Sequence, residues 1–547
     1  MSARYSIGFD YGTESVRALV VDVANGRVAG RGAQKYPHGV IDETLPTTGE
    51  KLPADYALQH PRDWLTSVAA ACKEAMKSAR VSADDVIGIG VDFTACTMLP
   101  CLRDGTPLCM VHPFDEIALA WPKLWKHHGA KAETDRINQV ANQRREKWLS
   151  RFGGVIGLEW FFPKLLETLN HAPRVTTAAE VWLEAGDWLV WQLVDGPFPE
   201  CSTSNLVRST CQAGYKAMWS PTGGYPSADF FAAVNPKLVP IVQHCLPGAH
   251  RSPGTAAGVL SATSAKMLGL RAGVPVSASI IDAHAGVPGA GVADAGTLVM
   301  VMGTSSCHML NSKIERLIPG VAGVVEDGIL PGFFGYETGQ ASVGDAFAWF
   351  VDAFKLSHEV LSGQAEKLPP GAGGVIALDW LNGCRTPHMD GNLSGAFVGI
   401  TLSTKPAQLY RALLEATAMG VRWIVDLLND GGVPVKKLVA SGGLPARSPL
   451  LMQIYADVLN REIKIAESDE SVALGSAILG TLAAGKKSTG HPSPAAAIRA
   501  MARQREDLIY TPNRAAAKAY EKLYQHYRSL GDTRGSVAQI MRAMRSH

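Results

Sequence analysis

Three short turns rich in glycine and hydroxyl-bearing residues each follow an apolar segment of this sequence. The first covers residues 10–15 (DYGTES), the second 303–306 (GTSS) and the third 441–444 (SGGL). Successive backbone N–H groups in such turns form concavities that bind anions, and glycine permits the close approach that a bound phosphate needs. The hydroxyl groups add further hydrogen-bond donors. Together, the three turns predict a phosphate-binding site.

Asp10 lies where the first apolar segment meets its turn. A carboxylate beside a bound polyphosphate would repel it unless a metal ion lies between them. Asp10 is therefore a candidate Mg²⁺ ligand, either directly or through a water molecule. The alternative is that the three turns are ordinary hairpin or strand-to-helix turns, which is the better explanation for any one of them alone. Their shared position at the ends of apolar segments favours the phosphate site.

A second acidic residue, Asp282, ends another apolar segment, in the sequence SIIDAHAGVPG. Phosphoryl transfer to an alcohol needs a carboxylate that accepts the hydroxyl proton, and a strand-end Asp facing a cleft suits that role. The alternative is a helix N-cap, because a helix is compatible with the residues that follow. Spacing alone does not separate the two. We expect His284 to be a packed histidine rather than a ligand.

Two common nucleotide-binding signatures are absent from the sequence. No GxxxxGK[ST] motif is present, which excludes a P-loop site. No GxGxxG motif opens a helix after a strand, so a dinucleotide-binding fold has no support. The glycine-rich run at 289–296 (GAGVADAG) lies between expected strands and has a different spacing. The phosphate site must therefore be of another type.

The elements that position these residues alternate between strands and helices in the first third of the chain. Apolar runs predict strands at 5–11, 17–23 and 86–93. Residues 61–80 begin with a proline and carry apolar side chains at helical spacing, which predicts a helix. A helix leading into the strand at 86–93 indicates an α/β layout. Residues 100–235, rich in Trp, Gly and Pro, are expected to form an insertion that decorates this sheet.

A second alternation of the same kind begins near residue 276. Residues 276–291 predict a strand that runs into a turn of small residues, and 296–310 predict a strand, a Gly-Thr-Ser turn and another strand. This repeats the opening pattern, so we infer an internal repeat at domain scale. Residues 406–430 predict a long amphipathic helix that ends at two glycines. Residues 436–460 predict a strand, a glycine-rich turn and a helix, and the segment from Ala515 a terminal helix.

The length of the chain and its composition bound the architecture further. A chain of 547 residues exceeds what one hydrophobic core normally supports. The repeat divides it into two expected domains, residues 1–292 and 293–547. No low-complexity linker separates them, so we expect the domains to pack closely with a cleft between them.

Charge and cysteine content restrict the location and the partners. The net charge of +2, with basic residues spread along the chain, argues against a nucleic-acid partner. Nine cysteines without CxxC spacing argue against a zinc or redox site and for a reducing compartment. No segment approaches the roughly 18 uncharged apolar residues of a membrane span. The N-terminus lacks the apolar region of a signal peptide. We therefore expect a soluble cytoplasmic protein without a membrane partner.

Four segments together resemble the FGGY family of carbohydrate kinases. They are DYGTESVRA from residue 10, IIDAHAGVPGAG from residue 280, MGTSS from residue 302 and SGGLPARSPLLMQIYADVLNREI from residue 441. The similarity extends from about Tyr5 to about Gly485. It implies an α/β protein with the actin-like ATPase (ribonuclease H-like) fold. In that fold two similar domains hold ATP and a sugar in the cleft between them.

Six longer segments resemble the corresponding segments of those family members that phosphorylate L-ribulose. These segments are rich in Trp and Phe, and they cover residues 88–100, 159–169, 184–193, 208–219, 332–350 and 379–400. The resemblance implies a ketopentose substrate, with L-ribulose first and D-ribulose or L-xylulose as alternatives. A non-catalytic, nucleotide-gated actin-like module is a further alternative. The presence of Asp282 argues against it, because a nucleotide switch needs no base directed at a sugar.

The resemblance also assigns roles to individual residues. Asp282 matches the catalytic base of the family, and Mg²⁺ is implied near Asp10. The sugar site is implied to be lined by Ala95, Lys216, Asp282 and Glu337. Contacts to ATP and its phosphates are implied at Asp10, Gly12, Thr13, Arg17, Gly303, Thr304, Ser305, Gly442 and Gly443, and the helical residues 447–453 follow the last of these turns.

One turn departs from the family pattern. Bacterial members tend to carry Thr-Gly-Ser or Thr-Ala-Ser where this chain has Thr94-Ala95-Cys96. A thiol is a weaker hydrogen-bond donor than a hydroxyl, so the departure bears on sugar preference rather than on the reaction.

Several of these residues also have purely structural explanations. Apart from the resemblance, Lys216 fits a surface lysine, and Glu337 fits a loop cap or a salt bridge. Four tryptophans are expected to be core anchors rather than sugar platforms: Trp160, Trp188, Trp191 and Trp219. Family members often pair, which makes a homodimer a candidate assembly.

Overall fold

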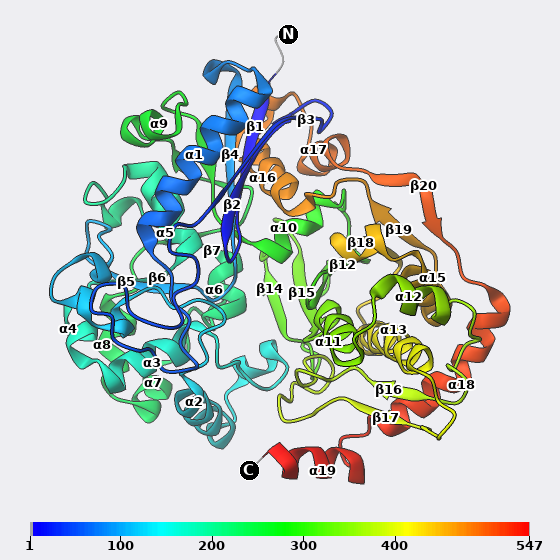
Figure 1. The fold of residues 1–547 in the computed structure, drawn as a ribbon. Helices are drawn as coiled ribbons and strands as arrows, with labels where there is room; N and C mark the ends of the chain where they lie inside the picture. Colours follow the sequence, from blue (N-terminus) through cyan, green and yellow to red (C-terminus); the bar gives the residue numbers. More distant parts are fainter. Residues whose placement is uncertain (1–3, 546–547) are drawn as a thin grey trace.

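The computed structural model describes residues 4–545, which form two lobes lying side by side (Figure 1). The first lobe is built on a seven-stranded sheet in the order β3-β2-β1-β4-β10-β9, with β11 paired to β4. Its strands are β1 (Tyr5–Tyr11), β2 (Ser15–Asp22), β3 (Val28–Lys35), β4 (Val86–Phe93), β9 (Ala256–Val259), β10 (Pro275–Ser277) and β11 (Ile280–Ile281).

The second lobe contains another seven-stranded sheet, in the order β14-β15-β13-β12-β18-β19-β20. Its strands are β12 (Thr297–Met302), β13 (Ser306–Ser312), β14 (Gly323–Glu326), β15 (Phe334–Gln340), β18 (Lys437–Ser441), β19 (Ile463–Ala466) and β20 (Gln504–Tyr510).

The two sheets share one pattern of strand directions. In the first sheet, β3, β2 and β1 pair antiparallel, β1, β4 and β10 pair parallel, and β9 closes the edge antiparallel. In the second sheet, β15, β13 and β12 pair antiparallel, β12, β18 and β19 pair parallel, and β20 closes the edge antiparallel. The internal repeat expected from the sequence is therefore confirmed, as is the α/β fold class.

Helix α1 (Pro61–Ala79) shows how local sequence places a helix on the first sheet. The ring of His60 caps the helix by accepting a hydrogen bond from the N–H of Arg62, and a proline occupies the first turn. The helix packs closely on β3 because two positions of that strand lack a side chain. A Cβ added at Gly30 would lie 2.2 Å from the carbonyl oxygen of Ala75. Its counterpart in the second lobe is the long helix α13 (Pro406–Asp430), confirmed over its predicted span.

The expected insertion is a region with a core of its own. It contains β5 (Met98–Cys101), β6 (Val181–Glu184) and β7 (Val207–Ser209), with β8 (Ala249–Arg251) pairing to β7. Trp160, Phe162 and Trp182 pack together in its core. Its helices are α2 (Lys131–Arg144), α3 (Phe161–His171), α4 (Pro173–Ala178), α6 (Thr210–Lys216), α7 (Ala228–Val234) and α8 (Leu238–His244). Helix α5 (Ala185–Asp195) lies in the same stretch of chain but packs in the core of the first sheet.

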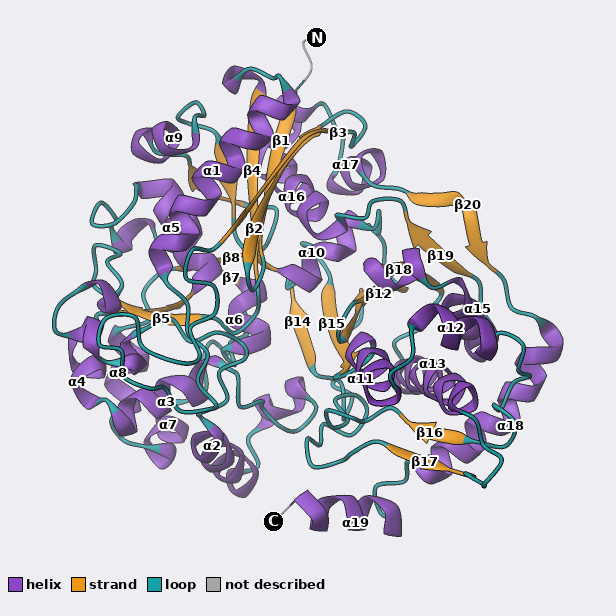
Figure 2. Ribbon diagram, viewed as in Figure 1, coloured by secondary structure: helices purple, strands orange, loops and turns teal. Residues whose placement is uncertain are grey.

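Two helices that pack closely against each other lie between the lobes (Figure 2). They are α10 (Asp282–Gly289) and α16 (Ser471–Thr489). The turn of small residues predicted after residue 281 is wrong, because these residues form α10. The small side chains instead permit a close helix crossing: a Cβ at Gly475 would lie 1.8 Å from the carbonyl oxygen of Ala285. Helix α16 belongs to the second half of the chain, yet it packs on β1 and β4 of the first sheet. A core cluster therefore draws residues from both halves.

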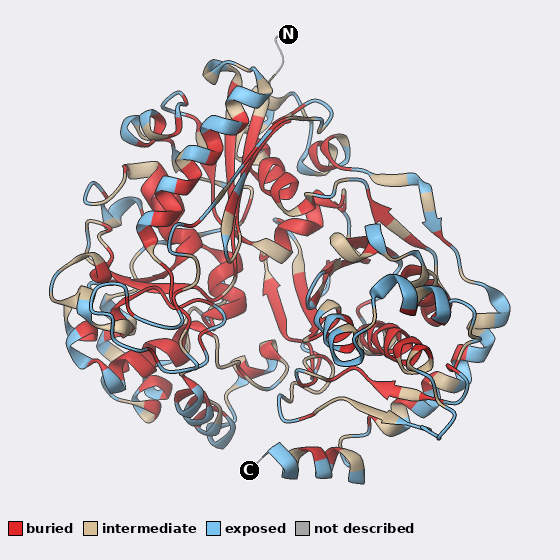
Figure 3. Ribbon diagram, viewed as in Figure 1, coloured by how far each residue is buried: buried red, intermediate tan, exposed pale blue. Residues whose placement is uncertain are grey.

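The remaining elements complete the two lobes. They are α9 (Ala262–Leu268), α11 (Gly344–Phe354), α12 (His358–Ala365), β16 (Ile376–Leu378), β17 (Ala396–Val398), α14 (Gly443–Arg447), α15 (Pro449–Leu459), α17 (Pro494–Met501), α18 (Arg514–Leu530) and α19 (Ser536–Arg545). Most of α13 is buried, as is α16 up to Thr481 (Figure 3). Trp160, Trp188 and Trp191 are buried as expected of core anchors, whereas Trp219 is half-buried and stacks on His250. Among residues 4–545, no helix is long and apolar enough to cross a membrane.

Candidate active site

Three carboxylates lie at one edge of the first sheet, at the carboxyl ends of neighbouring parallel strands. Asp10 is the second-last residue of β1, and its register partner on β4 is Asp92. Ile280 of β11 is in register with Asp92 on the other side, and Asp282 follows β11 directly. Ligands of open α/β sheets bind outside the carboxyl ends of the strands. The position of this acidic group is therefore that of a functional site.

Asp10 and Asp92 form a buried, interacting pair. Arg17 donates to Asp10 at 3.1 Å. Burial raises the pKa of Asp10, and the Arg17 guanidinium opposes that rise. Burial raises the pKa of Asp92 well above its ordinary value, and the nearby charge of Asp10 raises it further. The hydroxyl of Ser476 donates to Oδ2 of Asp92 at 2.5 Å, whereas Oδ1 has no hydrogen-bond partner among the described residues. This carboxylate pair with an unpartnered buried oxygen fits a hard divalent cation.

Asp282 is the first residue of α10, but its side chain does not cap the helix. The N-cap position is Ile281, and Oδ1 of Asp282 accepts from the adjacent N–H of Ala283 at 2.6 Å. The N-cap alternative is therefore wrong. Burial raises the pKa of Asp282 to about 7. The hydrogen bond from Ala283 lowers this pKa, and the charge of Asp10 raises it. A pKa near neutrality suits a group that takes up a proton.

The first two glycine-rich turns occupy equivalent positions in the two sheets. In each, a glycine N–H closes the hairpin: Gly12 donates to Ser15 at 3.0 Å and Gly303 donates to Ser305 at 2.9 Å. The first turn joins β1 to β2, and the second joins β12 to β13. Gly303, Thr304 and Ser305 are exposed, and Gly12 and Thr13 are half-buried, so both turns are open to a ligand. The structure therefore places the two turns at matching sheet edges.

The third turn lies beside the second, because β18 pairs parallel to β12. Ser441 at the end of β18 is in register with Val301. Gly442 has a φ of 99°, and a Cβ there would lie 2.5 Å from the carbonyl oxygen of Met302. Only glycine fits this position without strain. Gly443 then begins α14.

A buried cluster of charged groups joins the lobes on the side where the sugar is expected. Nζ of Lys216 lies 2.8 Å from Oε1 and 3.1 Å from Oε2 of Glu337, and both residues are buried. Nε2 of His284 lies 3.3 Å from the same carboxylate. The guanidinium of Arg385 also contacts it. Lys216 comes from α6 of the first half and Glu337 from β15 of the second, so the cluster spans the interface.

Ala95 belongs to a turn beside this cluster. The turn follows β4, and its next residue, Cys96, has a φ of 60°. The thiol of Cys96 is close enough to Lys216 for that ammonium to oppose the rise in its pKa caused by burial. Asp282 is likewise influenced by Lys216. Of the four residues predicted to line the sugar site, Lys216 and Glu337 are in direct contact, and the charge of Lys216 influences Asp282 and the neighbour of Ala95, Cys96.

Three residues of this site were missed or read differently from the sequence. Asp92 could have been found, because β1 and β4 end in the similar triplets FDY and VDF. Arg385 lies in the segment 379–400, which carried a resemblance without any residue being selected from it. His284 is buried, as expected of a packed histidine, but the group it packs against is Glu337. None of the three is marked by spacing to a partner, because the partners come from distant segments.

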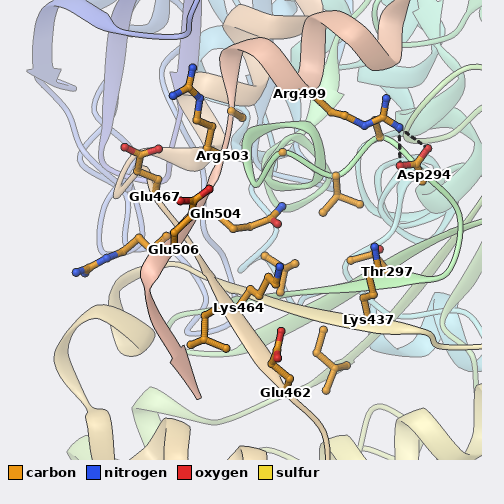
Figure 4. Close-up of a pocket in the computed structure, with 18 of the residues that line it drawn as sticks. Asp294, Thr297, Lys437, Glu462, Lys464, Glu467, Arg499, Arg503, Gln504 and Glu506 are labelled. Atoms are coloured by element: carbon orange, nitrogen blue, oxygen red, sulfur yellow. Dashed lines mark hydrogen bonds and ion pairs between the residues drawn. The ribbon is translucent and has the colours of Figure 1, made fainter. Parts of the chain in front are cut away.

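Two cavities differ in their relation to these residues. A cavity of about 380 Å³ lies between the insertion and the second lobe, with Glu159, Trp160 and Arg385 in its lining. Nζ of Lys216 lies over the ring of Trp160, 5.4 Å from its centroid, in a cation–π contact. The larger cavity, about 1280 Å³, is lined by residues that begin strands, such as Thr297 and Lys437 (Figure 4). It therefore lies at the opposite ends of β12 and β18 from the glycine-rich turns.

Comparison with known families accounts for most of the chain. The model of the N-terminal domain of the FGGY family of carbohydrate kinases matches residues 5–289. The model of the C-terminal domain of the same family matches residues 298–484.

Curated relatives match over nearly their whole length. The chain is similar to ribulokinases from Anoxybacillus flavithermus (45% identical) and Geobacillus thermodenitrificans (46% identical). Each match covers 97% of this chain and 95% of the relative.

Solved structures share the fold at lower identity. A xylulose kinase from Rhodospirillum rubrum is 24% identical with a TM-score of 0.77, and covers 97% of this chain and 99% of its own. A glycerol kinase from Plasmodium falciparum with ADP is 17% identical with a TM-score of 0.74, covering 96% and 98%.

Proposed function

We propose, from the premise that this chain belongs to the FGGY family of carbohydrate kinases, that it transfers the γ-phosphoryl group of ATP to L-ribulose. The ribulokinase relatives, with 45% and 46% identity over almost the full chain, are the observation that carries this substrate. The product is L-ribulose 5-phosphate, which places the enzyme in L-arabinose breakdown. The two repeated sheets agree with this proposal, because solved sugar kinases share the fold.

We propose that ATP binds along the three glycine-rich turns. Backbone N–H groups and hydroxyls of Thr13, Thr304 and Ser305 hold the phosphates, in turns that the N–H groups of Gly12 and Gly303 close. Gly442 and Gly443 face the adenosine side. Two features support this: the turns are accessible, and they stand at matching edges of the two sheets. Preorganised N–H donors stabilise charge that develops on a transferring phosphoryl group.

Mg²⁺ is the cation that this site would hold, through Asp10 with Asp92 beside it. When bound, it neutralises charge on the phosphate oxygens. The unpartnered oxygen of Asp92 and the burial of both carboxylates support this placement. Arg17 supplies a fixed positive charge at the same carboxylate.

Asp282 is the general base. Its carboxylate takes the proton of the 5-hydroxyl as that oxygen forms its bond to the γ-phosphorus, and the bond from phosphorus to the leaving ADP oxygen breaks. Burial supports this role, because it brings the pKa of Asp282 to about 7 and makes the carboxylate a better proton acceptor near neutral pH. Closure of the lobes excludes water, which prevents wasteful ATP hydrolysis.

The sugar is held by the buried cluster opposite Asp282. Lys216 and Glu337 offer a donor and an acceptor at fixed positions to a polyol, and Ala95 lies against it. Their convergence from separate elements supports the assignment. The cytoplasm is the expected location, supported by nine cysteines that are all free thiols, and a homodimer remains the proposed assembly.

ADP release with Mg·ATP tests the proposal across L-ribulose, D-ribulose, L-xylulose, D-xylulose, L-arabinose and glycerol. The largest kcat/KM is expected for L-ribulose. A preference for another ketose would keep the kinase and reject this substrate. Turnover without dependence on any sugar would reject the sugar assignment altogether.

A further inference from the structure

A lysine outside the proposed sugar cluster makes direct contact with the sugar turn. Lys164 of α3 is fully buried, and its Nζ donates to the carbonyl oxygen of Cys96 at 2.5 Å. It also donates to the carbonyls of Leu124 at 2.7 Å and Lys123 at 3.3 Å. An ammonium has three N–H groups, so these carbonyls complete its hydrogen-bonding capacity. No carboxylate among the described residues contacts this ammonium, so all of its hydrogen bonds go to main-chain oxygens.

The turn that Lys164 holds has an unusual backbone. Cys96 has a φ of 60°, a left-handed conformation that residues with a side chain seldom adopt. Such a conformation persists only where the surroundings enforce it. The N–H of Thr94 donates to Tyr11 at 3.2 Å, and the carbonyl of Thr97 accepts from Ala185 at 2.7 Å. Those two bonds fix the ends of the turn, and the bond from Lys164 fixes its middle.

The residue left unbonded by this arrangement is Ala95. Between residues 4 and 545, its N–H and carbonyl have no hydrogen-bond partner. Ala95 is half-buried, whereas Thr94, Cys96 and Thr97 are buried. Its main-chain groups are therefore free for a sugar hydroxyl, and their position depends on the conformation of Cys96.

We propose that Lys164 is a positioning residue that fixes Ala95 for sugar binding by holding the carbonyl oxygen of Cys96. Burying an ammonium is costly, and an apolar side chain would fill the same volume without that cost. What the ammonium adds is the set of three hydrogen bonds to the turn and to residues 123–124. This inference rests on the proposed sugar site and extends it to α3 of the insertion.

A neighbouring lysine provides a matched control. Lys123 is also fully buried in the insertion, but its Nζ donates to the carbonyl of Leu119 at 3.0 Å and not to the sugar turn. Lys164→Met and Lys123→Met therefore each remove one buried amino group and keep a side chain of similar length. They differ in whether the carbonyl of Cys96 loses its donor.

The experiment compares both variants with the wild type by kinetics and by hydrogen–deuterium exchange. Lys164→Met is expected to raise the KM for L-ribulose at least tenfold, to leave the KM for ATP within twofold, and to speed exchange at residues 94–97, which exclude Met98 because its N–H donates to the carbonyl of Lys123. Lys123→Met is expected to leave all three within twofold. Equal sugar KM values in the two variants would overturn the inference. Wild-type protein that turns over no ketose would instead reject the proposed function. The exchange data would then test only whether the hydrogen bond from Lys164 holds the turn at Cys96.

A second variant separates positioning from general loss of structure. Glycine adopts a φ of 60° without strain, so Cys96→Gly in the Lys164→Met background is expected to recover at least threefold of the lost sugar affinity. No recovery would overturn the role assigned to Cys96. Should Lys164→Met not fold, Lys164→Gln retains donors at a shorter reach and is expected to raise the sugar KM selectively. An unchanged sugar KM in that variant would also overturn the inference.

Discussion

The pKa of Asp282 gives the first prediction at the scale of single residues. Burial raises this pKa to about 7, and a general base must be ionised to accept a proton. We expect kcat/KM for the sugar to fall about tenfold per pH unit below 7 and to level off above it. A pH profile between 5.5 and 9 measures this. A profile without any ionisation near 7 would contradict the role of Asp282 as base.

Arg385 gives the second prediction. Its guanidinium contacts Glu337 together with Lys216, so its removal leaves the carboxylate with one cation fewer. We expect Arg385→Ala to raise the KM for the sugar about tenfold, equivalent to roughly 1.4 kcal/mol, with little change in the KM for ATP. Arg151→Ala is the matched control, since it removes another arginine that joins the two halves, to Glu315 at 2.6 Å. Equal effects of the two substitutions would count against a role for Arg385 at the sugar.

The site residues divide into those that sequence could predict and those that it could not. Asp10 and Asp282 stood out because an acidic residue at the end of an apolar segment is unusual. Lys216 and Glu337 lie in different halves of the chain, so their contact has no local pattern, and only the family resemblance suggested them. Arg385 and Lys164 act through partners that the fold alone brings near.

At the scale of elements, strands and long helices were predictable because their apolar periodicity is local. The strands at 5–11 and 86–93 and the helix at 406–430 are confirmed at the expected bounds. Helix α10 was expected only as an alternative to a turn, since a short run rich in Gly, Ala and Pro has no amphipathic pattern. Its small residues are explained by the crossing with α16, which is a tertiary contact.

The crossing of α10 and α16 yields the third prediction. A Cβ at Gly475 would meet main-chain atoms of α10, which begins with Asp282. We expect Gly475→Ala to lower the free energy of unfolding by about 1–3 kcal/mol and to reduce kcat by displacing α10. Denaturant unfolding and steady-state kinetics measure both effects.

Gly363 in α12 is the control for that substitution. A Cβ there meets nothing within 4 Å, so Gly363→Ala is expected to stabilise the protein by up to about 1 kcal/mol through helix propensity. Its kcat should not change. A Gly475→Ala protein as stable and active as the Gly363→Ala protein would contradict the importance of the crossing.

At the scale of the whole molecule, the two lobes share a core rather than merely touching. Helix α16 comes from the second half of the chain and packs on the first sheet, and one cluster of buried residues draws on both halves. We therefore expect calorimetry to record one unfolding transition, with the two lobes losing structure together. Two separate transitions in the ligand-free protein would contradict this coupling.

The central claim is that a strand-end carboxylate between these lobes accepts the proton of a ketose hydroxyl during phosphoryl transfer from ATP. Its most direct test is ribulose-dependent ADP release by the wild type and by Asp282→Asn. At pH 8 the variant should be at least as stable as the wild type, because the raised pKa means that the ionised carboxylate destabilises the fold there. We predict a loss of kcat of about 100-fold or more in a folded variant. An Asp282→Asn protein that phosphorylates L-ribulose at the wild-type rate would contradict the account.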